Sequence, residues 1–245
     1  MAGHGHKHVV IRRDGAAGLV LLDRVDRANA YTDAMLADLA LVLDELAADE
    51  AVRVVVVGSA VPGRFCSGAD LDEIRKRSTA DAGVLKSLAL FDRIEELPKP
   101  TIAAIGGAAY GGGLELALAC DLRIAAPEAR FAMPETARGI LPGAGGTWRL
   151  PRTVGPAMAR EMILFGRVLD GDAALACGLV SELVAPDRLL GRAVELAAQV
   201  ASRDFLATSL AKEALRKAAS ADGGREFVAR AQATLYGCPG KGDLR

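Results

Sequence analysis

Apolar residues near the start of the chain alternate between strand-like and helix-like spacing. Two β-rich runs, Val9 to Arg12 and Leu19 to Leu22, flank the dipeptide Asp14-Gly15 and predict a hairpin. Thr32 is placed to cap a helix whose apolar residues recur at helical spacing as far as Leu46. Strands and helices that follow one another in this way predict an α/β fold.

Two later runs are apolar at almost every position, Arg53 to Val57 and Thr101 to Ile105. Such runs are typical of strands covered on both faces, as in a parallel sheet. Helices are predicted between them, around Leu71 to Lys76 and Val84 to Leu97, and Pro98-Lys99-Pro100 ends the second one. The order is therefore that of βαβ units, which are joined by right-handed crossovers.

The second half of the chain is richer in helix. A glycine cluster at 106–113 leads into a helix at 114–119, and short strands are predicted at Leu122 to Ala125, Arg130-Phe131 and Val180 to Val184. Helical patterns dominate from about Gly145 onward. We expect an N-terminal tail (1–8), an α/β core (9–185) and a C-terminal helical region (186–245) that can serve assembly.

Composition and charge narrow the class of protein. The chain has 245 residues, and 30 Lys plus Arg nearly balance 31 Asp plus Glu. This balance gives no electrostatic argument for binding nucleic acid or an anionic membrane. No apolar stretch approaches the roughly 18 residues of a membrane span, and the first residues lack an apolar signal core. We expect a cytoplasmic protein.

The histidines and cysteines exclude several kinds of catalytic site. All three histidines lie within the first eight residues, and the four cysteines form no CxxC pair. The body of the chain therefore cannot build a Ser-His-Asp triad, a Cys-His pair or a His-ligated zinc centre. We expect no metal, and acid-base chemistry falls to carboxylates, Lys, Tyr or Cys.

Two glycine-containing loops follow predicted strands. In the segment 65–71, Ser67, Gly68 and Ala69 are small enough for a ligand to approach the backbone, and a helix starting at Asp70 would free the Ala69 N–H. An ordinary strand-to-helix turn is the alternative. Gly111-Gly112-Gly113 opens the second helix, where N–H groups are unpaired. Close packing of helix on strand would also require glycine there.

Together these loops can supply an oxyanion hole, because two backbone N–H groups from two turns can stabilise charge on a thioester oxygen. Since no nucleophile–base pair is available, an enolate is the better interpretation than a tetrahedral intermediate. Glu115, three residues after Gly112, and Glu135, at a second turn, are candidate acid-base groups. Burial would raise their pKa toward neutrality. Each could instead be a surface or capping carboxylate. Neither glycine loop matches a dinucleotide fingerprint or a P-loop.

These segments resemble the crotonase family of enoyl-CoA hydratases and isomerases. The resemblance runs from about residue 9 to residue 236 and rests on several motifs in order: 65–71, Gly106 with 110–115, Cys120-Asp121, Pro134-Glu135, 139–147, Gly166-Arg167, Ala173-Ala174 and 178–180. It implies a spiral of ββα units with a C-terminal helical trimerisation region, and homotrimers that often pair into hexamers.

The resemblance also implies an activity and a set of site residues. It places the oxyanion hole at the N–H groups of Ala69 and Gly112. Glu115 would activate water for attack on Cβ, and Glu135 would deliver a proton to Cα. Because both carboxylates are present, we expect a hydratase that converts 2-trans-enoyl-CoA into 3-hydroxyacyl-CoA, of the fatty-acid β-oxidation type. Expected CoA or substrate contacts are Ala28, Ser67, Gly68, Asp70, Leu71, Asp72, Tyr110 and Gly111, with no cofactor beyond the substrate's own coenzyme A.

Two departures from the family pattern leave alternatives open. The chain ends at Arg245, where relatives continue into a last helix that helps cover the CoA adenine. Met133 stands where some hydratases carry a polar residue. An enoyl-CoA isomerase or a hydratase for a specialised branched acyl-CoA therefore remains possible on the same scaffold. A non-catalytic role, including RNA binding, is disfavoured by the neutral charge and the two glutamates.

Overall fold

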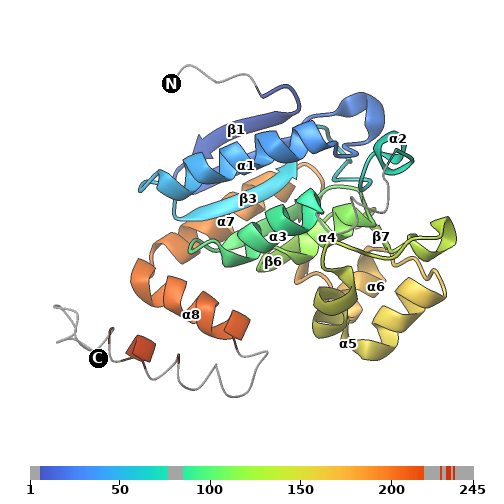
Figure 1. Ribbon diagram of the computed structural model, residues 1–245. Coiled ribbons are helices and arrows are strands. Elements are labelled where there is room, and N and C mark those ends of the chain that lie inside the picture. The colour runs from blue at the N-terminus through green and yellow to red at the C-terminus, as the bar shows by residue number, and fades with distance from the viewer. Residues whose placement is uncertain (1–5, 77–84, 218–226, 228–229, 233, 235–245) are drawn as a thin grey trace.

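The α/β prediction is confirmed by the computed structural model, which describes residues 6–76, 85–217, 227, 230–232 and 234. Strands form a six-stranded sheet in the order β1-β2-β3-β4-β6-β8 and a small sheet of β5 and β7. Helices lie on both faces of the large sheet, and α8 extends away from it (Figure 1). The domain boundaries expected at residues 8 and 185 stay predictions.

The predicted hairpin starts the large sheet. Strands β1 (Val9–Asp14) and β2 (Ala17–Leu22) pair antiparallel, and Gly15 takes a positive φ of 56° in the turn between them. Strand β3 (Val54–Ser59) pairs with β2 in parallel, and β4 (Thr101–Ile105) pairs with β3 in the same way. The valines of β3 are buried on both faces, which explains why that run lacks polar alternation.

The spiral arises because consecutive strands enter different sheets. Strand β4 belongs to the large sheet, and the chain then turns into β5 (Ala108–Tyr110) of the small sheet before α4 (Gly112–Leu118). The next pair repeats the pattern: β6 (Leu122–Ala125) joins the large sheet and β7 (Arg130–Ala132) joins β5. This repetition places the start of α4 and the end of β7 beside one another.

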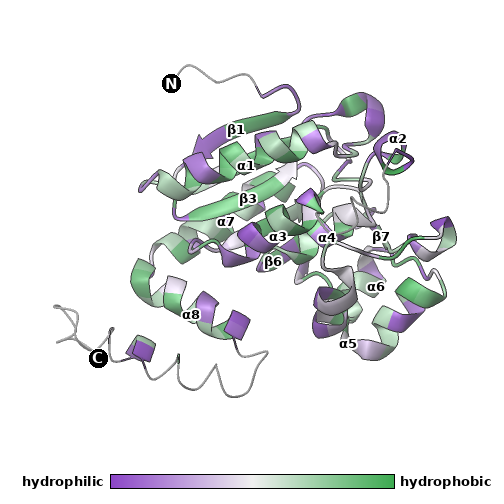
Figure 2. Cartoon of the chain, in the orientation of Figure 1, coloured by the Kyte–Doolittle hydropathy of each residue, from purple (hydrophilic) through white to green (hydrophobic). Residues whose placement is uncertain are grey.

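Two apolar clusters hold the helices against the large sheet. One contains α1 (Asp33–Ala48) and α3 (Lys86–Glu96) on one face, and the other contains α7 (Leu189–Ala201) on the opposite face. Figure 2 shows apolar residues along β3 and α7. Thr32 caps α1 as predicted, since its side-chain oxygen accepts from the Met35 N–H at 3.2 Å.

The remaining elements are mostly helical, and most of them lie in the second half of the chain. They are α2 (Leu71–Ile74), the 3-10 turns η1 (Val25–Arg27) and η3 (Thr136–Arg138), α5 (Gly146–Leu164), α6 (Gly171–Ala176), β8 (Glu182–Leu183) and α8 (Phe205–Lys217). The non-helical Gly155 divides α5 into two parts. The expected trimerisation role stays a prediction, and the observation about the chain end at 242–245 lies outside the described residues.

Candidate active site

The first loop is held open around Ala69. The Tyr31 N–H donates to the Gly68 carbonyl at 2.8 Å, and the Asp70 N–H donates to the Tyr31 carbonyl at 2.9 Å. Asp70 also caps α2, since its carboxylate accepts from the Asp72 N–H at 2.9 Å. Among the described residues, no hydrogen-bond acceptor faces the Ala69 N–H. The loop thus fixes the backbone on either side of one unused donor.

The second loop needs its three glycines for close approach. A Cβ on Gly111 would lie 2.6 Å from Oε1 of Glu135, one on Gly112 would lie 2.0 Å from the Tyr31 hydroxyl, and one on Gly113 would lie 2.0 Å from the Cys66 carbonyl. The packing explanation for these glycines is therefore correct. The Gly112 N–H, at the first position of α4, nonetheless has no acceptor in the described part of the chain.

The two loops touch each other. Gly68 has a positive φ of 100°, and a Cβ there would lie 2.7 Å from the Tyr110 carbonyl and 3.3 Å from the Gly112 nitrogen. The loops are also paired by the Tyr110 N–H, which donates to the Cys66 carbonyl at 3.2 Å. Ala69 and Gly112 line the same cavity. The unused N–H donors of Ala69 and Gly112 are therefore part of the lining of one cavity.

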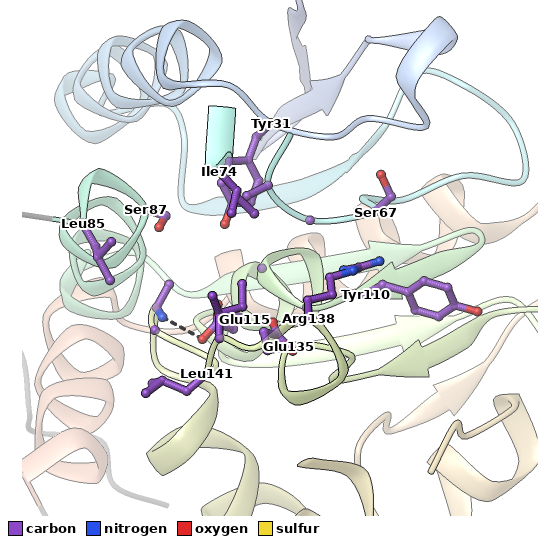
Figure 3. Close-up of a pocket in the computed structure, with 17 residues that line it drawn as sticks. Tyr31, Ser67, Ile74, Leu85, Ser87, Tyr110, Glu115, Glu135, Arg138 and Leu141 are labelled. Atoms are coloured by element: carbon purple, nitrogen blue, oxygen red, sulfur yellow. Dashed lines mark hydrogen bonds between the residues drawn. The ribbon is translucent and has the colours of Figure 1, made fainter. Parts of the chain in front are cut away.

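This cavity has a volume of about 460 Å³ and is lined by both candidate glutamates (Figure 3). Its apolar lining comes from segments before α3 and after η3: Ile74, Leu85, Ile140 and Leu141. The Tyr31 side chain is buried and packs edge-on against Phe91. The volume and the mixed lining suit a small organic group rather than an ion.

Glu115 lies in the first turn of α4 and is 3% exposed. One carboxylate oxygen, Oε1, accepts from the Ala144 N–H at 2.7 Å and from the Gly146 N–H at 2.8 Å. Burial raises the pKa of this carboxyl, while the two N–H donors and the Arg149 charge act to lower it. Both bonds fall on Oε1, so Oε2 is left for another partner.

Glu135 lies three residues after β7, directly before η3, and is 6% exposed. Its Oε2 is buried without a hydrogen-bond partner among the described residues. Burial raises the pKa of Glu135 to about 7, and repulsion from Glu115 adds to the rise. An orphaned buried carboxyl oxygen is uncommon in a folded protein and indicates a missing partner, such as a ligand.

A second cavity of about 370 Å³ adjoins the first at Ser67, which lines both. Ala28, the glycines Gly106 and Gly107, and the cationic side chains of Arg64 and Arg130 contribute to its lining. Glu128 also lines it, so the two arginines leave one net positive charge, which makes this cavity suitable for an anionic group such as phosphate.

The structure brings most of the predicted site residues together. Eight of them line the first cavity: Ser67, Gly68, Ala69, Tyr110, Gly111, Gly112, Glu115 and Glu135. Ala28 lines only the second cavity. Their contacts with a substrate stay predictions.

The stretch 70–72 lines neither cavity. Asp70 is buried and forms an ion pair with Arg24 at 2.7 Å, which holds the pKa of its carboxyl below the usual range. Asp72 faces Arg75 at 2.9 Å, and Leu71 is exposed. Because Asp70 caps α2, the helix carries these side chains away from the loop. A role for them in CoA binding stays a prediction.

Sequence reasoning missed several lining residues, notably Tyr31 and Arg138. Tyr31 lies three residues after Ala28, which the family resemblance implies as a CoA contact. Arg138 stands one helical turn after Glu135, a spacing that places both side chains on one side of η3. Leu85 carried no local signal, whereas Ile140 and Leu141 lie in the segment 139–147 that carries the family resemblance.

The described residues contain no group of three or more His, Cys, Asp or Glu side chains that could hold a metal ion. Within the same residues, no helix has both the length and the apolar character needed to cross a membrane. The expectations about metals, cofactors and cellular location stay predictions.

Comparison with known proteins identifies the family. A family model described as enoyl-CoA hydratase/isomerase matches residues 12–239. The chain belongs to this family. The predicted crotonase-family enzyme of the enoyl-CoA hydratase class is thereby confirmed.

Relatives in this family agree with the assignment. The chain is 42% identical over 213 residues to methylglutaconyl-CoA hydratase from Rattus norvegicus, a match covering 84% of the chain and 68% of that protein. The corresponding Homo sapiens protein is also 42% identical, and the match spans 63% of its length. Enoyl-CoA hydratase domain-containing protein 2 from Mus musculus is 44% identical over 209 residues, or 83% of this chain and 71% of that one.

Solved structures confirm the crotonase-like fold. An enoyl-CoA hydratase from Bacillus anthracis superposes with a TM-score of 0.90 at 34% identity, covering 95% of this chain and 92% of that chain. Pseudomonas aeruginosa DspI superposes with a TM-score of 0.88 at 32% identity, covering 94% of each chain.

Proposed function

We propose that this family member is an enoyl-CoA hydratase, which adds water to 2-trans-enoyl-CoA and yields 3-hydroxyacyl-CoA. One observation carries the proposal: two buried glutamates with different hydrogen-bond environments line one cavity with two unused backbone donors. A hydration needs a base for water, an acid for carbon and a site for enolate charge. The cavity offers a candidate for each role.

The backbone donors would bind the thioester oxygen. When water adds at Cβ, negative charge moves through the double bond onto this oxygen, giving an enolate. The N–H groups of Ala69 and Gly112 would stabilise that charge without reorganising, because the surrounding loop contacts already fix them. Removal of one such donor typically costs about 10²–10³ in kcat.

The two glutamates divide the proton transfers according to their surroundings. Glu115 is the base, since two N–H donors on Oε1 favour its charged form and Oε2 can hold the water. Glu135 is the acid, since its unpartnered oxygen and its pKa of about 7 favour a protonated carboxyl. Water gives its oxygen to Cβ and a proton to Glu115, while Glu135 gives its proton to Cα. Exchange with solvent restores both groups.

Coenzyme A would extend from the first cavity into the second. Ser67 lines both cavities, so the pantetheine chain would pass beside it. Arg64 and Arg130 would then face the phosphates. Assembly into homotrimers or hexamers, a cytoplasmic location and a role in fatty-acid oxidation belong to the same proposal.

A second candidate is a hydratase for a specialised branched acyl-CoA. Two observations favour it: relatives named methylglutaconyl-CoA hydratase match at 42% identity, and Arg138 lines the first cavity. The Arg138 guanidinium forms no ion pair with the described residues. A cation there would suit an acyl group that ends in a carboxylate.

Product analysis distinguishes these activities. Purified protein is incubated with crotonyl-CoA, with a 3-enoyl-CoA and with a glutaconyl-type thioester, and products are separated by chromatography and weighed by mass spectrometry. A gain of 18 mass units from crotonyl-CoA supports the hydratase. Conversion of the 3-enoyl substrate without mass change indicates an isomerase, and hydration of the acidic thioester alone supports the second candidate. Salt-sensitive RNA retention on a filter, without turnover, would favour a binding role.

A further inference from the structure

Arg149 is a buried cation that contacts the loop holding Glu115 rather than Glu115 itself. It belongs to the first turn of α5, and its side chain is 4% exposed. Its guanidinium donates to Asp92 at 2.6 Å, to Glu95 at 2.6 and 2.8 Å, and to the Ala144 carbonyl at 3.0 Å. A buried arginine with two carboxylates on α3 would be sufficient for helix packing. The hydrogen bond to the Ala144 carbonyl is directed instead at the active site.

Ala144 connects this arginine to the glutamate. Its N–H donates to Oε1 of Glu115, while its carbonyl accepts from Arg149. Gly146, two residues on, donates to the same carboxylate oxygen. The Ala144 carbonyl belongs to the peptide that joins residues 144 and 145. This peptide lies between the two peptides that carry the N–H groups of Ala144 and Gly146. Holding that middle peptide therefore sets the angle between the two N–H groups that hold Glu115.

The loop depends on such support because of its composition. Gly143, Gly145 and Gly146 surround Ala144, and glycine lets the backbone leave the bound conformation readily. Gly145 has a positive φ of 113°, and a Cβ there would lie 2.0 Å from Nη1 of Arg149. The guanidinium is thus packed directly on the strained residue of the loop.

We propose that Arg149 is a positioning residue for hydration: it locks the loop 143–146 so that Glu115 is held by Oε1 and keeps Oε2 for water. The inference rests on the proposed function, because it assigns Arg149 a part in the step that Glu115 performs. Asp92 and Glu95 anchor the guanidinium from the far side, so α3 carries the other end of the connection.

A purely structural arginine would behave differently on substitution. Substituting such an arginine would lower the fraction of folded protein. The protein that remained folded would retain its kcat and its pH profile. A positioning arginine changes the chemical step itself. Its loss frees the loop, weakens both N–H bonds to Glu115 and removes a nearby positive charge, so the pKa of Glu115 rises further. Because the base must be ionised, the acid limb of the kcat profile then moves to higher pH.

The experiment compares Arg149→Met and Arg149→Lys with the wild type in crotonyl-CoA hydration. Arg149→Met is expected to lose about 10- to 100-fold in kcat, the range for a small displacement of a catalytic group. KM should change less than about threefold, because an interaction that is lost only in the transition state lowers kcat and leaves substrate binding largely unchanged. Arg149→Lys keeps the charge and should recover part of the loss and of the pH shift.

Arg123 provides a matched control. It is a half-buried arginine that donates to the carbonyls of Leu179 at 2.8 Å and Cys120 at 2.6 Å, and it forms no hydrogen bond with the loop 143–146. Arg123→Met should reduce stability while folded protein keeps the wild-type pH profile. Should Arg149→Met not fold, Glu95→Gln loosens the anchor and keeps the arginine, and it should lower kcat with little change in KM.

A second comparison separates positioning from general damage. In a Glu115→Gln background, Arg149→Met should cause little further loss of kcat, because the residue it serves is already gone. Full additivity of the two losses, or an unmoved acid limb in folded Arg149→Met, would overturn the proposal. A wild-type protein that does not hydrate crotonyl-CoA or the acidic thioester would instead overturn the proposed function.

Discussion

Replacing Glu135 by glutamine should alter the pH dependence of stability in a way that activity measurements do not detect. The carboxyl is buried with one unpartnered oxygen, so the folded protein favours the protonated form. At pH values between the pKa of Glu135 in the unfolded chain and its pKa in the folded protein, the unfolded chain has released a proton that the native state still holds. Stability therefore falls as the pH rises through this window.

The size of the effect follows from the two pKa values. The folded value of about 7 exceeds the ordinary value of 4.5 by about 2.5 units. Each unit corresponds to about 1.4 kcal/mol, so Glu135 removes about 3 kcal/mol of unfolding free energy between pH 4 and pH 8. Glutamine does not titrate. The stability of Glu135→Gln relative to wild type should consequently rise by about 3 kcal/mol over that interval.

Urea unfolding followed by circular dichroism, at one fixed protein concentration, measures this difference. Fixed concentration matters because subunit association would contribute to the apparent stability. Glu50→Gln, at an exposed glutamate, serves as the control and should give a difference that is flat with pH. A flat difference for Glu135→Gln as well would refute the conclusion that this carboxyl is buried and proton-binding.

Three further predictions follow from the same contacts. The value of kcat/KM should fall as the pH rises through about 7, because Glu135 must be protonated to act as the acid, and a pH–rate profile tests this. Asp70→Asn should cost about 1–3 kcal/mol at pH 7 by removing the carboxylate partner of the half-buried Arg24, and the cost should shrink as the pH falls through the lowered pKa of Asp70; urea titrations over an acidic pH series decide it. Arg138→Leu should lower kcat/KM for a glutaconyl-type thioester about tenfold or more and affect crotonyl-CoA less, through the pKa of Glu135, which the Arg138 charge lowers; equal losses on both substrates would contradict a role in selecting an acidic acyl group.

The elements that sequence could predict are those whose signals are local. The hairpin at Asp14-Gly15 and the cap at Thr32 depend on neighbouring residues, and the valine run of β3 records burial on both faces. The oxyanion loops and both glutamates were found because their spacing resembles a family pattern. Their position around one cavity agrees with that resemblance.

Other features depend on contacts between distant segments. Arg24 and Asp70 are 46 positions apart, so no local pattern predicts the ion pair between them. Arg149 reaches Glu95 across 54 positions and Ala144 across only five, so no local pattern shows that it joins α3 to the active-site loop. Tertiary structure is needed to see these connections.

The central claim is that two glutamates with different surroundings hydrate an enoyl thioester. Its most direct test is the loss of conjugated-enoyl absorbance from crotonyl-CoA with wild type, Glu115→Gln and Glu135→Gln, each checked for native folding. We predict rapid loss with wild type and a fall in kcat of at least about 10²-fold in each variant, as expected for a positioned acid or base. Near-normal turnover in either variant would contradict the two-glutamate mechanism.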